Sequence, residues 1–181
     1  MLSRRTFLKV GVGGALVLVV ARSLDRGVFA QDNGPGSLDL KKLANKDAEC
    51  LAAIVPAILK GALPDDPVAR QVAINEVVEA FDRTVAGLSP AMQKEVDELL
   101  SLLTFSVSRR FVADVAKPWR EASEADVREF LDRWRQSRFA LLQQAYQALA
   151  RLMLACWYGN PLSWGKIGYG GPPHAQELGL Q

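Results

Sequence analysis

The stretch that decides the fold is residues 138–158, which read RFALLQQAYQALARLMLACWY. Apolar side chains recur here every three or four residues, which is the period of one helix face. They are Phe139, Leu142, Tyr146, Leu149, Met153 and Cys156. A second apolar row beside the first consists of Leu141, Ala145, Ala148, Leu152 and Ala155. A helix with so wide an apolar surface needs neighbours on most sides, so we expect it in the middle of a helical bundle.

The chain before residue 138 predicts four more helices. Ser123 with Asp126 three residues later is a helix start signal, whereas Pro56 should bend or interrupt the first helix. No stretch alternates apolar and polar residues with β-branched enrichment, so no sheet is expected. The sequence predicts an all-α fold, a bundle of about five helices. The first four cover about residues 43–60, 66–87 and 90–110 and a segment that begins at residue 123.

The chain changes character at the end of this last helix. Gly159 can take the left-handed capping conformation and Pro161 lacks an amide hydrogen, so we expect an extended, aromatic, Gly- and Pro-rich tail from about residue 159. Large aromatic residues with a polar group are favoured at interfaces. The predicted partner interface comprises Trp157, Tyr158, Asn160, Pro161, Trp164, Ile167, Gly168, Tyr169, Gly171, Pro172 and Pro173. The alternative is that the tail folds back over its own bundle.

An ordinary globular composition and a small net charge limit the classes of function. The 181 residues are 49% hydrophobic and 23% charged, which is typical of one domain. The formal net charge is +2, but five basic residues fall in the first thirty, leaving 17 basic and 19 acidic residues afterwards. Nucleic-acid binding needs clustered lysine and arginine, so we set nucleic acid aside as a partner.

Few residues suited to catalysis or metal binding are present. Cys50 and Cys156 are the only cysteines and form no C-x-x-C pattern, so dithiol, zinc and covalent haem sites lack their ligands. These two cysteines are either a disulfide pair or two buried, unpaired apolar residues. His174 is the only histidine, which removes most catalytic triads and histidine metal sites. We therefore expect no catalytic, cofactor or metal site in this chain.

The first thirty residues have the three parts of an export signal. Residues 10–21 are a mildly apolar run of twelve, which spans about 18 Å as a helix and falls short of a hydrocarbon core of about 30 Å. A permanent membrane anchor is therefore the weaker interpretation. The start of the segment resembles the signals of the bacterial twin-arginine (Tat) pathway, whose motif S/T-R-R-x-F-L-K is complete. Its residues here are Ser3, Arg4, Arg5, Phe7, Leu8 and Lys9.

This resemblance divides the chain into three parts and implies a place in the cell. Residues 1–30 are expected to be the signal, with a plausible cleavage site after Ala30, followed by a linker over 31–42 and a helical domain over 43–181. The destination is the periplasm. Because the Tat pathway carries folded proteins, something must fold before export, usually because it holds a cofactor or a partner.

The tail carries a second resemblance. Residues 157–173 read W-Y-G-N-P-x-x-W-x-x-I-G-Y-x-G-P-P, and together with a Tat signal and a helical chain this is similar to the gluconate 2-dehydrogenase subunit 3 family. The resemblance implies a non-catalytic small subunit that escorts a large FAD-dependent dehydrogenase of the glucose-methanol-choline (GMC) oxidoreductase type. FAD is then expected in the partner subunit and not in this chain.

Further partners follow from the same resemblance. The Tat translocase would be a transient partner, and a cytochrome c subunit is a third component that such complexes allow. Association with the membrane would then arise through the complex. A different class of function stays open: a free-standing periplasmic helical protein that binds a small ligand or contributes directly to redox chemistry.

Overall fold

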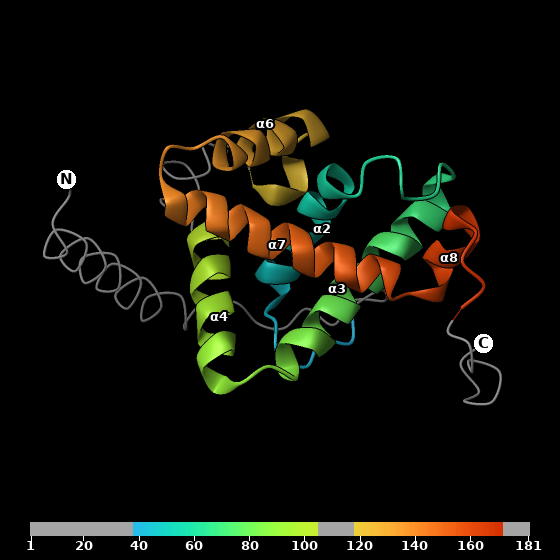
Figure 1. Ribbon diagram of the computed structural model, residues 1–181, viewed down its shortest axis with the longest axis horizontal. Helices are drawn as coiled ribbons and strands as arrows, with labels where there is room; N and C mark the ends of the chain where they lie inside the picture. Colours follow the sequence, from blue (N-terminus) through green and yellow to red (C-terminus); the bar gives the residue numbers. More distant parts are fainter. Residues whose placement is uncertain (1–37, 105–117, 172–181) are drawn as a thin grey trace, which may run out of the picture.

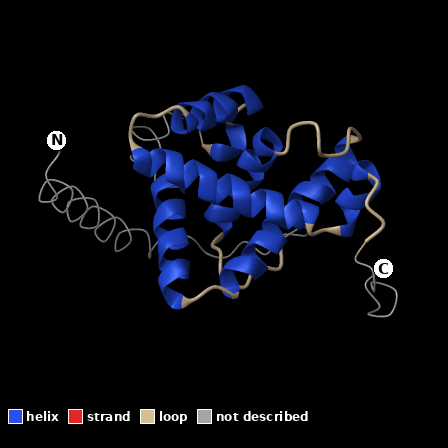
Figure 2. Cartoon of the chain, viewed as in Figure 1, coloured by secondary structure: helices blue, strands red, loops and turns tan. Residues whose placement is uncertain are grey.

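The computed structural model describes residues 38–104 and 118–171, and within them the chain is helical (Figure 1). No strand occurs in the described ranges, as Figure 2 shows, so the predicted all-α class is confirmed. The elements are α2 (Asn45–Ile58), α3 (Pro67–Ala86), α4 (Pro90–Thr104), the short 3-10 helix η2 (Trp119–Glu121), α6 (Glu124–Arg135), α7 (Ala140–Tyr158) and α8 (Pro161–Ile167).

Local start signals place the helices where the sequence predicted them. The side chain of Asp66 accepts a hydrogen bond from the amide of Ala69 at 2.8 Å, and Pro67 is the first residue of α3. Ser123 and Asp126 form a reciprocal capping box at the start of α6. Each pair satisfies amides that have no partner within the helix, so these starts depend on a few neighbouring residues.

Pro56 does not interrupt the first helix as expected, because α2 continues to Ile58. The amide that proline lacks belongs to the last turn, where few helical bonds follow. Ile54 and Val55, just before it, are fully buried, and their packing holds this turn in place. The chain then turns at Gly61, whose positive φ of 81° suits a residue without a side chain.

The helix in the middle of the bundle is α2, and our expectation for α7 was wrong. α2 packs against α3, α4, η2, α6 and α7, and it buries Ala48, Cys50, Leu51, Ile54 and Val55. α7 runs across the front of the bundle (Figure 1) and packs on α2, α3, α6 and α8 through one face. The second apolar row of α7 is largely alanine, and burial of so little area gains little free energy.

A buried carboxylate fixes the chain that leads into α2. Asp82 of α3 is fully buried and accepts backbone hydrogen bonds from Lys41, Lys42 and Leu43 at 2.6, 2.9 and 2.8 Å. We call this contact the Asp82 clasp. Leu38 and Leu40 pack against the core beside it. Residues 38–43 therefore lie against the helical domain and are held there by both polar and apolar contacts.

Candidate partner-binding surface

The tail is not the extended ribbon that we expected, because residues 161–167 form α8. The side chain of Asn160 accepts the amide of Leu162 at 2.9 Å, and Pro161 is the first helical residue. Gly168 ends the helix with a left-handed φ of 67°. Asparagine as N-cap, proline at the first position and glycine after the last are all favoured at helix ends. The residues read as a turn are therefore the two caps of a short helix.

The aromatic pair of the tail belongs to the cap that closes α8. The amide of Tyr169 donates to the carbonyl of Trp164 at 3.0 Å, and the two rings meet edge to face with centroids 5.4 Å apart. A hydrogen bond from an amide to the carbonyl five residues earlier, together with an apolar contact between the same two residues, is the pattern of a Schellman motif at a helix C-terminus. The indole Nε1 of Trp164 also donates to the carbonyl of Tyr158 at 3.1 Å. Trp164 therefore serves the local fold of the tail.

Two hydrogen bonds join α8 to the bundle, and a third closes its own first turn. The side-chain amide of Asn160 donates to Glu76 of α3 at 3.3 Å, and Lys166 Nζ donates to the carbonyl of Leu63 at 3.1 Å. Ser163 is buried and donates to the carbonyl of Asn160 at 2.8 Å. Trp157 is buried in the core. This part of the tail therefore folds back over its own bundle, which is the alternative to a free interface.

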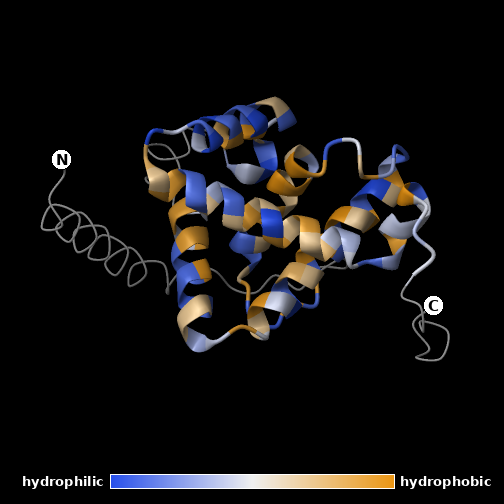
Figure 3. Cartoon of the chain, in the orientation of Figure 1, coloured by the Kyte–Doolittle hydropathy of each residue, from blue (hydrophilic) through white to orange (hydrophobic). Residues whose placement is uncertain are grey.

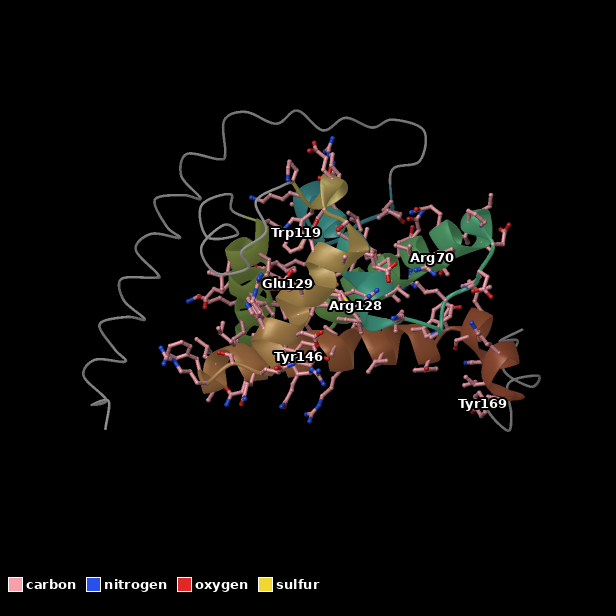
Figure 4. The ribbon with its side chains drawn as sticks, turned by 90° about the horizontal axis from the view of Figure 1, so that it is seen from above. Arg70, Trp119, Arg128, Glu129, Tyr146 and Tyr169 are labelled. Carbon is pink, nitrogen blue, oxygen red and sulfur yellow. The ribbon has the colours of Figure 1, made fainter. Side chains whose placement is uncertain are left out.

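Other members of the predicted interface remain accessible. Tyr158, Leu162, Ile167 and Tyr169 are each 42–56% exposed, and we call them the α8 patch. Tyr169 lies at the α8 end of the molecule, away from Trp119, Arg128 and Glu129 (Figure 4). Gly171 has a φ of 92°, and Pro172 and Pro173 lie outside the described residues. The predicted interface is thus divided between the core and the surface.

The outer side of α7 is a second exposed surface, on which leucines and alanines that the sequence pattern did not place at the surface lie beside glutamines and an arginine. Its front carries both apolar and polar segments in Figure 3. An α-helix has 3.6 residues per turn, so the exposed residues of α7 fall on one side of the helix axis, in an arc centred near Arg151. We call this arc the α7 outer face. It comprises Ala140, Leu141, Gln143, Gln144, Gln147, Ala148, Arg151, Leu154, Ala155 and Tyr158.

The charge pattern of the sequence could have indicated this face. No acidic residue occurs between Asp132 and Glu177, and Arg151 is the one charged residue of α7. Leu141 is 63% exposed and Leu154 is 38% exposed, although leucine is usually buried. Contiguous exposed apolar residues mark interaction surfaces more often than isolated ones do, so the α7 outer face and the α8 patch are the candidate binding surfaces.

Comparisons with known proteins add no relative. No protein-family model, no curated protein and no solved structure matches the chain. The functional argument therefore rests on the sequence motifs and on the geometry of the two surfaces.

Both cysteines are buried and no disulfide joins them, which is the second of the two alternatives raised by the sequence. Cys156 Sγ lies 3.9 Å from Thr84 Oγ1. Burial raises the pKa of the Cys156 thiol, an effect that the contact with Thr84 and the charge of Arg83 only partly offset. Since the thiolate is the nucleophile, Cys156 is held in its unreactive form and serves as a small apolar core residue.

An open depression of about 360 Å³ lies on α6 and is lined by Ala125, Arg128, Glu129, Asp132, Arg133 and Gln136. Its arginines pair with neighbouring acids on the same helix, Arg128 with Glu124 at 2.6 Å and Arg133 with Glu129 at 3.2 Å.

Within residues 38–104 and 118–171, no three potential metal ligands come together, and no helix is both long and apolar enough to cross a bilayer. The Tat motif lies outside the described residues.

Proposed function

We propose that this protein is a non-catalytic small subunit that binds a periplasmic FAD-dependent dehydrogenase of the GMC type and escorts it through the Tat pathway. The observation that carries the proposal is the complete motif from Ser3 to Lys9, because that pathway exports proteins that have already folded. The role of carrying such a signal for a folded, flavin-loaded partner would account for both the N-terminal motif and the C-terminal motif of this chain. The closing motif over residues 157–173 supports the same class of partner through its resemblance.

The accessible apolar residues near the C-terminal end support a binding role. The α8 patch has two tyrosines and two large aliphatic residues at the surface, and the exposed side of α7 continues with leucine and alanine. Aromatic and aliphatic residues that are exposed in a free subunit become anchors when a partner covers them. α8 itself is fixed by Asn160 and Lys166, so the patch is presented on a preformed support, which lowers the entropy cost of binding.

The proposal is tested by changing the signal and following the partner. Arg4→Lys and Arg5→Lys together preserve charge but remove the planar guanidinium groups that the export receptor reads. The matched control is the double change Arg22→Lys and Arg26→Lys, which is chemically identical but lies outside the motif. We expect the first variant to retain in the cytoplasm both this protein and a dye-linked, flavin-containing dehydrogenase activity, and the control to export both.

Cell fractionation with immunodetection of this protein and a dye-linked dehydrogenase assay of each fraction gives the result. If the motif variant stays in the cytoplasm while every periplasmic flavoprotein activity remains in place, this protein escorts none of them and the proposal is wrong. If the protein purified alone from the periplasm instead carries a bound chromophore, the free-standing alternative is favoured.

A further inference from the structure

We infer that the α7 outer face binds the partner subunit, and that the partner contributes one carboxylate to pair with Arg151 beside the exposed leucines, alanines and glutamines of this face. This inference rests on the proposed function, since it specifies which surface the partner covers and what chemistry the partner must supply. It assigns the main contact to α7 and not to the aromatic tail.

The first reason is that, among the described residues, Arg151 has no charged or aromatic partner, whereas the other arginines each have one. Among the arginines that the structure describes, six lie next to an acid: Arg70, Arg83, Arg120, Arg128, Arg133 and Arg135. Arg138 lies over the ring of Phe139 at 5.1 Å. Arg151 is exposed, and its side chain makes no ion pair, ring contact or hydrogen bond with the described residues.

The second reason is the composition around Arg151. Its neighbours one turn before and after on the helix are Gln147, Ala148, Leu154 and Ala155, and all four are exposed. None of them can neutralise a guanidinium group. A partner that covers these neighbours also removes water from Arg151, and burying an unpaired charge costs several kcal/mol. The covering surface must therefore bring an acid, for which arginine offers a bidentate match.

A second copy of this chain is a poor occupant of the face. In a two-fold symmetric pair the same surface meets itself, and this surface contains a base and no acid. Two copies would bring Arg151 near Arg151 without a carboxylate to separate them, and like charges across an interface are unfavourable. The missing charge has to come from a different protein.

A lipid surface is also a poor occupant. Helices that lie in a membrane interface keep basic residues on the polar side and bury the opposite side. In α7 the arginine lies at the centre of the exposed arc, with Leu154 on one side and Ala155 on the other. Insertion of this arc would carry the charge inward with it, which is costly. Alanines at 148 and 155 instead leave room for a protein backbone to approach closely.

The test begins with photo-cross-linking in cells that make the full chain with its partner. A photoreactive phenylalanine derivative replaces Ala148 or Leu154 on the α7 outer face, Leu162 on the α8 patch, or Lys94, which is exposed on α4. We expect positions 148 and 154 to yield an adduct that contains a flavoprotein, with the cross-linked peptide adjacent to an aspartate or glutamate. Position 94 should yield none.

Charge exchange then tests the role of Arg151. Arg151→Glu should weaken binding of the purified subunits at least about 30-fold, which is about 2 kcal/mol and typical of an arginine anchor. Lys94→Glu makes the same change in net charge and should alter binding less than about twofold. Replacing the partner's cross-linked acid by arginine should restore binding to the Arg151→Glu variant and not to the unchanged protein. Circular dichroism of each variant checks that it is folded.

Each result has a separate meaning. If position 94 or 162 forms the flavoprotein adduct and 148 and 154 do not, the inference is wrong although the proposed function stands. Adducts from 148 or 154 to a second copy, or sedimentation of the purified protein with anionic lipid vesicles that Arg151→Glu abolishes, would overturn the assignment of the occupant. If no position forms an adduct with any flavoprotein, the inference is wrong, and the signal variant Arg4→Lys with Arg5→Lys decides separately whether the proposed function fails.

Discussion

Replacement of Asp82 by alanine should release the segment that leads into α2. The carboxylate is fully buried and accepts three backbone hydrogen bonds, from Lys41, Lys42 and Leu43. Hydrogen bonds to a charged group each contribute about 1.5–3 kcal/mol, but contributions within one network do not add. Disrupting a buried charged network costs about 3–5 kcal/mol. Water can reach the partly buried amides of Lys41 and Lys42 once the carboxylate is gone, so we expect the lower value, about 3 kcal/mol.

Two measurements check this prediction. Urea unfolding followed by circular dichroism gives the change in the free energy of unfolding. Trypsin digestion reports the local effect, because Lys41 and Lys42 lie inside the clasp, and cleavage follows the open fraction when opening is fast. A loss of about 3 kcal/mol corresponds to cleavage about 100-fold faster at these two sites. The matched control is Asp65→Ala, which removes an exposed carboxylate from the loop before α3.

The outcome that refutes the reasoning is specific. If Asp82→Ala and Asp65→Ala unfold within about 0.5 kcal/mol of each other, as ordinary surface changes do, the clasp contributes nothing. Equal protection of Lys41 and Lys42 in the two variants would lead to the same conclusion. Early cleavage at many sites along the chain would instead report global unfolding, which the urea curve distinguishes from local release.

Three further predictions concern single residues. Burial raises the pKa of Asp47 above its usual value of 3.8, so the charged form is disfavoured in the folded state and stability falls as pH rises from about 3.8 through the folded pKa. Asp47→Asn should flatten that slope, with urea midpoints that match the unchanged protein below pH 3.8 and exceed it at pH 7. Cys50 and Cys156 should react slowly with a thiol reagent in the native protein and give two thiols in urea, whereas none would indicate a bond between them. Asn160→Ala should destabilise α8 by about 1 kcal/mol, seen as faster hydrogen exchange at the amide of Leu162.

The starts of α3 and α6 could be predicted because their signals are local. Asp66 with Pro67, and Ser123 with Asp126, act on amides within three residues. The same reasoning would have found α8, since Asn160 and Pro161 repeat the pattern of Asp66 and Pro67. We read them as a turn because the glycines that follow favoured irregular structure, whereas one of those glycines is the cap itself.

Burial on α7 and the Asp82 clasp were not predictable in the same way. Periodicity shows that one side of α7 is apolar, but the position of that helix in the bundle depends on contacts with residues far away in sequence. Asp82 does carry a sequence signal, because it falls beside Val78 and Val85 on a buried face of α3. Its partners are backbone amides about forty residues earlier, and backbone groups have no sequence pattern.

The central place of α2 also determines the order in which this chain can fold. α2 is made before all the helices that surround it in the described structure, and α6 and α7 follow it by more than sixty residues. Of the described helices, a nascent chain that ends near residue 118 can offer only α3 and α4 to cover Leu51, Ile54 and Val55. Contacts between such distant segments close large loops and form slowly. α2 therefore stays partly uncovered until synthesis has passed Trp157, and the core of the described residues is completed only then.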